Sequence, residues 1–460
     1  MEKNSVKSTS LFDLDGHPSF GKSFPVALQH LLAMLVGNTL PSLVLTNALK
    51  GTQFEIPSDQ AVYVIQAGMF VAALATLLQL YPVMKVGAKL PVIMGVSFAY
   101  IPILLEVGKA YGYGGVFGAQ IFGGVVAFVV GILIGKIRKY FPPIVSGTVV
   151  LTIGLSLYPV AINYMAGGNG SPMYGSGWNW LVAIVVLIVV LVCNMFGKGY
   201  IKLAAILVGI IVGYILSLII NATAAPGFMS FHNVIEADWF TYPRLLPFKL
   251  TFPKPALITM AIMYIVNSVQ AVGDISSTTI GGLDREPTDQ EISGSIKSNG
   301  VMSVLGGLFG ALPTATYSQN VGIVSMTKVV ARSVLRITAI MILLAGFVPK
   351  FGGLMMSIPQ CVIGGATISV FAQITMNGIR LITSEELSVR NSTIVGLGVA
   401  LGMGIVSVPA ATEALDPTVK MIFTSSPVIL ATLVVFVLNI ILPSKTLAEE
   451  QAEREAMEQE

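Results

Sequence analysis

The stretch Tyr317-Ser318-Gln319-Asn320-Val321-Gly322 decides how this chain is interpreted, because it places two side-chain amides in a region that otherwise resembles membrane. Apolar sequence precedes it at 304–312 and follows it at 323–330 and 337–348. Lipid offers no hydrogen-bond partners, so Gln319 and Asn320 must face protein, a ligand or a water-filled cavity. Their donors and acceptors suit the edge of a flat heterocycle. The alternative is an amide pair that only joins helices.

The composition is that of a polytopic membrane protein. Of 460 residues, 54% are hydrophobic and only 11% are charged, whereas soluble proteins carry about a quarter charged residues. The net charge of +3 says little about partners, and we expect no nucleic-acid partner. The two cysteines, Cys193 and Cys361, are expected to be buried thiols, and the three dispersed histidines favour no metal site.

Motifs of soluble enzymes are missing from the sequence. It contains no glycine-rich phosphate loop that ends in Gly-Lys-Ser/Thr, and no nucleophile elbow. We therefore expect neither an enzyme nor an ATP-driven pump, and no cofactor. The functions that remain for a membrane protein of this kind are those of a transporter driven by an ion gradient or of a channel.

Apolar windows predict about fourteen transmembrane spans, although counting alone gives eleven to fourteen. The expected spans are 26–46, 61–80, 90–105, 114–135, 143–161, 178–196, 202–221, 255–278, 297–313, 317–331, 333–349, 354–377, 392–410 and 424–443. With this count, Lys and Arg lie mainly in loops on the side of the amino terminus, which the positive-inside rule makes cytoplasmic. Both tails, 1–25 and the acidic 444–460, are then cytoplasmic in a plasma-membrane protein.

Two of the expected spans are interrupted by helix-breaking residues. Pro91–Pro102 contains glycine and serine, and Leu312–Gly322 contains Pro313 and Thr314. They occupy comparable positions in the two halves of the chain. Paired broken spans indicate an inverted-repeat transporter whose site lies near the bilayer midplane. The alternative is a pair of short structural spans.

A polar stripe crosses the span 255–278. Asn267, Gln270 and Asp274 stand at i, i+3 and i+7, so they share one helix face. An aspartate at mid-span costs roughly 2.5–3.5 kcal/mol, which makes Asp274 a candidate functional acid that faces a cavity, a cation or the hydroxyls of Ser276 and Ser277. The alternative is an aspartate that caps a broken helix.

Two further polar residues lie in apolar segments. His30 is the other titratable group within the spans, and a single histidine there is more often a packing residue than a proton carrier. Asn299 begins a glycine-rich span and is suited to hydrogen bonding across helices.

Motifs along nearly the whole chain resemble one known family, the nucleobase–ascorbate transporters (nucleobase–cation symporters), and in particular bacterial xanthine and urate permeases. The matching stretches are Gln29–Ala33, Pro143–Gly147 with Ile153–Leu157, Gln270–Asp274, Arg285–Pro287 with Glu291, Gln319–Gly322 with Met326-Thr327, and Ile358-Pro359 through Arg380. Gln319-Asn320-Val321-Gly322 matches the family's signature Gln/Glu/Pro-Asn-x-Gly.

The resemblance implies a fold of two inverted seven-span repeats, with short β-strands in spans 3 and 10. A core domain would comprise 26–135 (spans 1–4) and 255–349 (spans 8–11). A gate domain would comprise 143–221 (spans 5–7) and 354–443 (spans 12–14). Members of this family are often dimeric, so a homodimer is expected.

The resemblance also implies roles for site residues. Gln319 would form a bidentate hydrogen bond with a purine edge, because glutamine there is typical of xanthine and urate carriers. Phe98 would stack on the ring, backbone groups around Ser97 and Ser318 would contact its polar edge, and Asn320 would hold the backbone of its span.

Three positions depart from the family pattern. Gln270 stands where the family has a substrate-binding glutamate, and Asn299 stands where xanthine permeases have an aspartate implicated in proton coupling. Lys328 replaces a frequent glycine. Asp274 is then the acid left for coupling to protons or sodium. The alternatives are a uracil or other nucleobase carrier, an uncoupled facilitator or anion pathway, and a membrane-embedded purine sensor.

Overall fold

The computed structural model describes residues 9–137, 142–168, 170–424, 426–443 and 447–449, and most of them are helical. The ends of both predicted tails, 1–8 and 450–460, lie outside the described residues. Prolines mark where several of the helices begin. For example, α4, α9 and α17 each have proline in the first turn, where the missing N–H breaks no helical bond.

The longer helices follow the predicted spans closely. They are α1 (Phe20–Leu49), α2 (Ser58–Leu80), α3 (Ile101–Ile137), α4 (Pro143–Met165), α5 (Gly177–Phe196), α7 (Ala205–Thr223), α9 (Lys254–Leu283), α10 (Asp289–Phe309), α11 (Ser318–Thr327), α12 (Arg332–Gly346), α14 (Gln360–Ile382), α15 (Val389–Ser407) and α17 (Pro427–Ile441). Shorter elements connect them: η1 (Phe98–Tyr100), α6 (Tyr200–Leu203), α8 (His232–Glu236), α13 (Pro349–Met356), η3 (Pro409–Thr412) and α16 (Pro417–Thr424).

Nine helices of the described chain are long and apolar enough to cross a membrane, which is fewer than the fourteen spans predicted. The pair α12 and α13 makes a tenth if it is counted as one span, although the two helices are bent by 80°. The difference arises because several predicted spans are short helices or strand–helix segments. The chain is therefore a mostly helical, multi-pass membrane protein.

The predicted spans 90–105 and 114–135 are joined in α3, but the helix is broken at Gly112. Its φ of 66° is left-handed, and a Cβ there would lie 2.5 Å from the ring of Phe54. Glycine is required on both counts. Before the break, the chain runs through a strand at 94–96, then through η1, and then through a short helical segment at 101–111.

A two-stranded antiparallel sheet joins the two interrupted segments. β1 (Met94–Val96) pairs with β2 (Thr314–Thr316), with Gly95 opposite Ala315. The strand expected in span 3 lies inside 90–105. The second strand lies just before the predicted range 317–331 rather than within it, because Pro313 ends the preceding turn and β2 is extended up to Tyr317. All six strand residues are buried.

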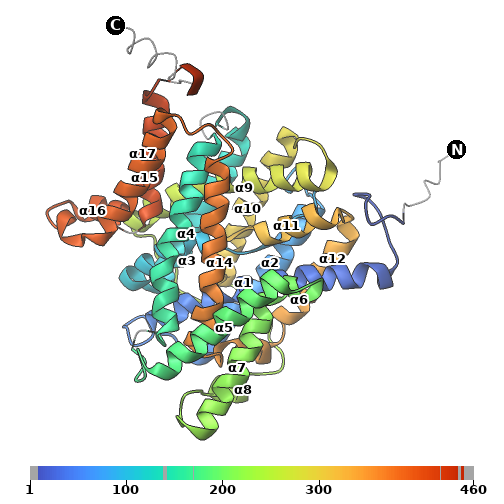
Figure 1. Cartoon of the computed structure of the whole chain (residues 1–460), viewed down its shortest axis with the longest axis vertical. Coiled ribbons are helices and arrows are strands. Elements are labelled where there is room, and N and C mark those ends of the chain that lie inside the picture. The colour runs from blue at the N-terminus through green and yellow to red at the C-terminus, as the bar shows by residue number, and fades with distance from the viewer. Residues whose placement is uncertain (1–8, 138–141, 169, 425, 444–446, 450–460) are drawn as a thin grey trace.

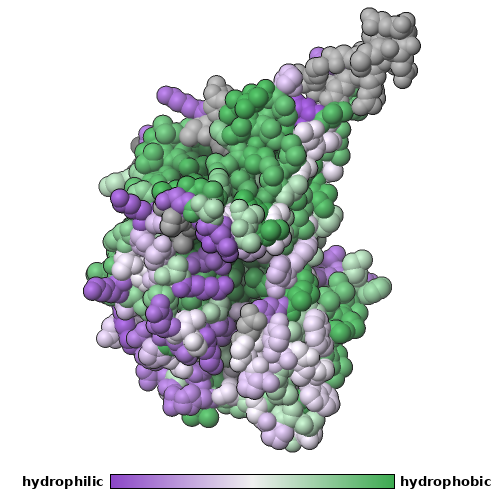
Figure 2. Space-filling model, turned by 90° about the vertical axis from the view of Figure 1, so that its left-hand side faces the viewer, coloured by the Kyte–Doolittle hydropathy of each residue, from purple (hydrophilic) through white to green (hydrophobic). Residues whose placement is uncertain are grey.

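The helices pack in two sets. In one set α10 packs on α3, α3 on α9, α12 on α2 and α11 on α9; in the other α14 packs on α4 and α5, α5 on α7, and α15 on α17. Figure 1 shows α4 and α14 running side by side through the centre, with α15, α16 and α17 at the upper left, away from the amino-terminal end. Figure 2 shows a broad apolar area on the face turned to the viewer, beside a strongly hydrophilic area.

Of the two cysteines, Cys361 is buried as predicted. Cys193 is only partly buried, because α5 is among the helices with large exposed apolar side chains.

Candidate functional site

The two strands place two helix starts beside one another. α11 begins at Ser318, directly after β2, and η1 begins at Phe98, directly after β1. The Tyr317 N–H donates to Ile93 O at 3.0 Å, and the Ser97 N–H donates to Pro313 O at 2.9 Å. Helix starts carry free N–H groups and partial positive charge, so this arrangement favours an electron-rich or anionic ligand.

Asp274 of α9 is held by the strand and by the start of α11. Its Oδ1 accepts a hydrogen bond from Ser318 Oγ at 2.7 Å, and its Oδ2 accepts one from Thr316 Oγ1. Both oxygens accept, as in an ionised carboxylate. The side chain is buried, and these two bonds offset the cost of burying it.

Asp274 was expected to face a cavity, a cation or the hydroxyls of Ser276 and Ser277, and those two hydroxyls are not the ones that bind it. Ser276 and Ser277 follow it on the same helix, but Ser277 points outward and is exposed. Ser276, two positions on, lies on a different helix face from Asp274, and Ser277, three positions on, makes no hydrogen bond to that carboxylate among the described residues. The hydroxyls that bind Asp274 come from β2 and α11 instead.

A second polar contact joins α9, α10 and β2. Asn299 Nδ2 donates to Asn267 Oδ1 at 3.0 Å, and Thr314 Oγ1 donates to Asn299 Oδ1 at 3.5 Å. Thr314 and Thr316 are two residues apart on a strand, so they face the same side and meet the polar stripe of α9 and α10. Asn299 therefore does hydrogen-bond across helices.

Asn320 is tied to α1 rather than to its own span. Its Nδ2 donates to His30 O at 3.0 Å and lies 3.0 Å from His30 Nδ1. Both residues are buried, with His30 completely so. The histidine and the signature asparagine thus form one contact between α1 and α11, and the side chain of His30 has a packing partner.

Gln270 and Gln319 differ from the other polar residues of the site. Both are partly buried, and neither side chain has a hydrogen-bond partner within the described part of the chain. One turn after each stands a glycine, Gly273 and Gly322, where an added Cβ would meet nothing within 4 Å. Each helix therefore has open space at the glycine one turn after its glutamine.

α9 and α11 contact each other on both sides of Gly322. A Cβ at Gly281 would lie 2.1 Å from Ser325 Oγ, so the helices are in close contact there. Asp274 joins the start of α11 through Ser318, and the segment between these two contacts holds Gly322 with room around it.

Phe98 and Ser97 follow β1, whose partner strand β2 leads into α11. Phe98 is buried and packs edge-on against Phe371 of α14, with ring centroids 5.3 Å apart. Ser97 Oγ accepts from the Ala99 N–H at 3.2 Å and so caps η1. Because the Ser97 N–H binds Pro313 O, that N–H is not free for a ligand.

Three residues of the site were missed in the sequence. They are Thr316, Tyr317, whose hydroxyl donates to Val96 O at 2.6 Å, and Asn38, whose Oδ1 accepts from the Val96 N–H at 2.8 Å. A Cβ on Gly95 would lie 2.3 Å from the Tyr317 ring, so the glycine makes room for the tyrosine. The signals were present, as polar residues in apolar segments.

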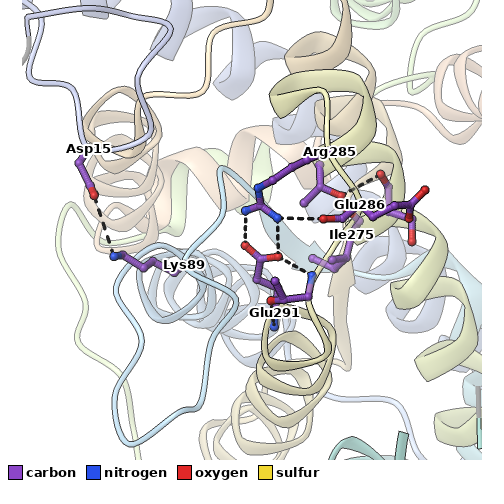
Figure 3. A network of polar contacts seen from close by, with 9 residues as sticks. Asp15, Lys89, Ile275, Arg285, Glu286 and Glu291 are labelled. Atoms are coloured by element: carbon purple, nitrogen blue, oxygen red, sulfur yellow. Dashed lines mark hydrogen bonds and ion pairs between the residues drawn. The ribbon is translucent and has the colours of Figure 1, made fainter. Parts of the chain in front are cut away.

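An ion pair fixes the turn between α9 and α10 (Figure 3). Arg285 donates to both carboxylate oxygens of Glu291, at 2.9 Å and 2.5 Å, and the Thr288 N–H donates to Glu291 Oε2 at 2.8 Å. Burial alone would raise the pKa of Glu291, but the bonds from Arg285 and Thr288 outweigh it and hold that pKa below its ordinary value. Asp15 and Lys89 form a looser pair nearby, at 3.9 Å.

Comparisons of the sequence with known proteins identify relatives of this chain. The sequence profile described as "Permease family" matches residues 21–411. Uric acid permease PucK of Bacillus subtilis is 36% identical over 88% of this chain and 92% of its own length. The chain belongs to the nucleobase–ascorbate transporter family. Xanthine permease of Bacillus subtilis is 32% identical over 92% of this chain and 94% of its own length. The predicted family is therefore confirmed, and its members are permeases rather than enzymes.

Among solved structures, the transmembrane domain of the cyanobacterial bicarbonate transporter BicA has the same fold. It aligns with a TM-score of 0.57, covering 92% of this chain and 98% of that one, at 14% sequence identity. At this identity the likeness concerns the fold alone.

Proposed function

We propose that this family member is a secondary active transporter of oxidised purines, with xanthine and urate as its substrates. The observation that carries the proposal is the pair of unpartnered amides, Gln270 of α9 and Gln319 of α11, each one turn before a glycine with open space beside it. The names of the relatives, uric acid permease and xanthine permease, support the same substrate class.

Each part of the site has a role in binding a planar oxopurine. Gln319 donates and accepts along one edge of the base. The free N–H groups at the start of α11 contact a carbonyl or anionic edge, which the helix dipole favours. Gln270 adds a second neutral amide, and Phe98 supplies an aromatic wall. Because Gln270 is uncharged, an anionic purine such as urate meets no repulsion from it.

Asp274 is proposed as the coupling acid. It is the carboxylate bound to both β2 and α11, so a change of its charge or its partners acts directly on the start of the substrate-binding helix. Asn299 stands where the family resemblance implies an aspartate for proton coupling. Its hydrogen bond with Asn267 is between two neutral amides, so this pair supplies no coupling acid. We propose a proton as the coupled cation, with sodium as the alternative.

Alternating access is proposed to occur by an elevator movement of a core domain (26–135 and 255–349) against a gate domain (143–221 and 354–443). The two packed sets of helices support this division. The fourteen spans in two inverted repeats are supported by β1 and β2, which occupy comparable positions in the two halves and pair with each other. We also propose that the protein is a homodimer in the plasma membrane and that both of its termini are cytoplasmic.

Uptake into proteoliposomes tests the proposal. Radiolabelled xanthine and urate are offered under imposed proton or sodium gradients, with a panel of unlabelled bases as competitors. We expect saturable uptake of xanthine or urate, and loss of it in Gln319→Ala but not in Gln53→Ala, which removes an amide in an exposed loop. Uptake that uracil competes away and oxopurines do not would contradict it.

A second candidate function is an anion pathway. BicA, a bicarbonate transporter, shares the fold but at 14% identity says nothing of the substrate here, so the anion pathway stays an alternative to be tested. The same liposomes distinguish the two: anion conductance without saturable purine uptake would select the anion pathway.

A further inference from the structure

A pocket lined by none of the polar-site residues lies between the two segments that join the predicted core and gate domains. One segment is the connection from α7 to α9, which includes α8; the other is α13, which joins α12 to α14. The pocket has a volume of about 160 Å³ and is lined by residues of these segments and of α2, including Asp59, Gln66, Glu236, Asp238, Arg244 and Pro349. We call it the linker pocket.

The two segments are fastened to each other around the pocket. Lys350 Nζ donates to Val234 O at 2.8 Å and to Ile235 O at 2.9 Å, and the Thr241 N–H donates to Phe347 O at 3.0 Å. Phe240 stacks on Phe347, with ring centroids 5.6 Å apart. The pocket walls are therefore held by specific contacts.

The lining of the linker pocket contains several carboxylates, which accept hydrogen bonds. Asp59, Glu236 and Asp238 contribute three carboxylates, and only Glu236 has an ion-pair partner within the described residues, His232 at 3.0 Å. The one basic side chain of the lining, Arg244, lies over the ring of Tyr63, 5.5 Å from its centroid. The carboxylates thus leave the pocket with a net negative charge.

A buried amide points independently to a ligand. Gln66 lines the pocket but is only 1% exposed. Its Nε2 donates to Val348 O at 3.1 Å, whereas its Oε1 has no hydrogen-bond partner among the described residues. A buried acceptor left without a donor costs about 1–3 kcal/mol. The oxygen is closed to solvent, so a ligand N–H would remove that cost once the Gln66 side chain turns toward the pocket.

We propose that the linker pocket binds a small organic ammonium, whose positive charge faces Asp59 and Asp238 and whose N–H groups satisfy the acceptors. A bare metal ion fits less well, since no group of three His, Cys, Asp or Glu side chains converges on one point in the part of the chain that the structure describes. A bound ammonium bridges α2 and both connecting segments. Its binding does not depend on what the protein transports.

Binding to the purified full-length protein tests this site, with putrescine as the ligand. We expect saturable stabilisation against heat, which follows from binding to the folded state only. Tetramethylammonium, which has the charge but no N–H groups, and Mg²⁺ are compared at matched ionic strength and are expected to stabilise far less. Equal stabilisation by either ion would overturn the proposal.

Variants locate the site. Asp238→Asn removes an exposed charge and is expected to weaken putrescine binding by about fivefold, and Gln66→Leu by about tenfold or more. Glu413→Gln removes an exposed carboxylate outside the pocket and is the matched control. If Gln66→Leu does not fold, Asp59→Asn replaces it, because Asp59 is exposed at the first turn of α2. Wild-type affinity in the pocket variants would refute the site.

A lipid headgroup can supply the same ammonium. In nanodiscs, stabilisation by phosphatidylethanolamine but not by phosphatidylcholine, lost in Asp238→Asn, would support the site and assign the ammonium to lipid. Stabilisation by putrescine in either lipid, lost in the same variant, would support the site with a free ligand.

Discussion

Removing the Ser318 hydroxyl tests how the substrate-binding helix is positioned. Ser318→Ala deletes the 2.7 Å hydrogen bond to Asp274 Oδ1 and leaves that oxygen without its donor. A hydrogen bond to a charged group contributes about 1.5–3 kcal/mol. If the whole loss falls on the bound state, transport efficiency, kcat/KM, drops by about 10- to 150-fold, since each 1.4 kcal/mol is tenfold.

The assay is initial-rate uptake of urate and xanthine into proteoliposomes, together with thermal stability of the purified protein. Ser156→Ala is the matched control, because the Ser156 hydroxyl bonds only to Ile153 O of its own helix. We expect the control to transport at the wild-type rate. Wild-type kinetics and stability in Ser318→Ala would refute the reasoning that Asp274 positions the start of α11.

The remaining predictions concern charge. Asp274→Asn is expected to abolish accumulation against a gradient while purine binding persists, and full accumulation would contradict its role as the coupling acid. Gln270→Glu is expected to lower urate uptake by about tenfold or more relative to a neutral purine, because a carboxylate close to an anion costs at least about 1.4 kcal/mol in a partly buried site; unchanged urate uptake would count against Gln270 as a ligand. Glu291→Gln tests the turn after α9. Because the folded-state pKa of Glu291 is lowered, its stabilisation is present above the unfolded pKa and is lost as the pH falls through the folded pKa. The variant should therefore melt below the wild type at pH 7, and the gap should close on acidification; a gap that is independent of pH would show that the Arg285 pair contributes no stability.

The elements of the fold were largely predictable from local sequence. Apolar runs located most of the helices, with larger shifts at α3, α10 and α14, because a helix of membrane length has to be apolar over most of its length. Glycine and proline marked both interrupted segments, and each contains a strand. Local sequence does not show which segments meet, however, and the pairing of Gly95 with Ala315 joins residues far apart in the chain.

The site was predictable in its members but not in its contacts. Asn267 and Asp274 stood out as polar residues on one helix face, and both take part in the buried network. Their partners, Asn299 and Thr316, come from segments that only the folded chain brings near. The serines that follow Asp274 were among its expected partners because they are near it in sequence, whereas Thr316 and Ser318 become neighbours only in the folded chain.

A structure of the protein with saturating urate tests the central claim most directly. We expect the purine in the open space beside Gly273 and Gly322, with the amide of Gln319 within hydrogen-bond distance of its edge. A purine bound elsewhere, or a Gln319 side chain that bonds only to a neighbouring helix in that complex, would contradict the account.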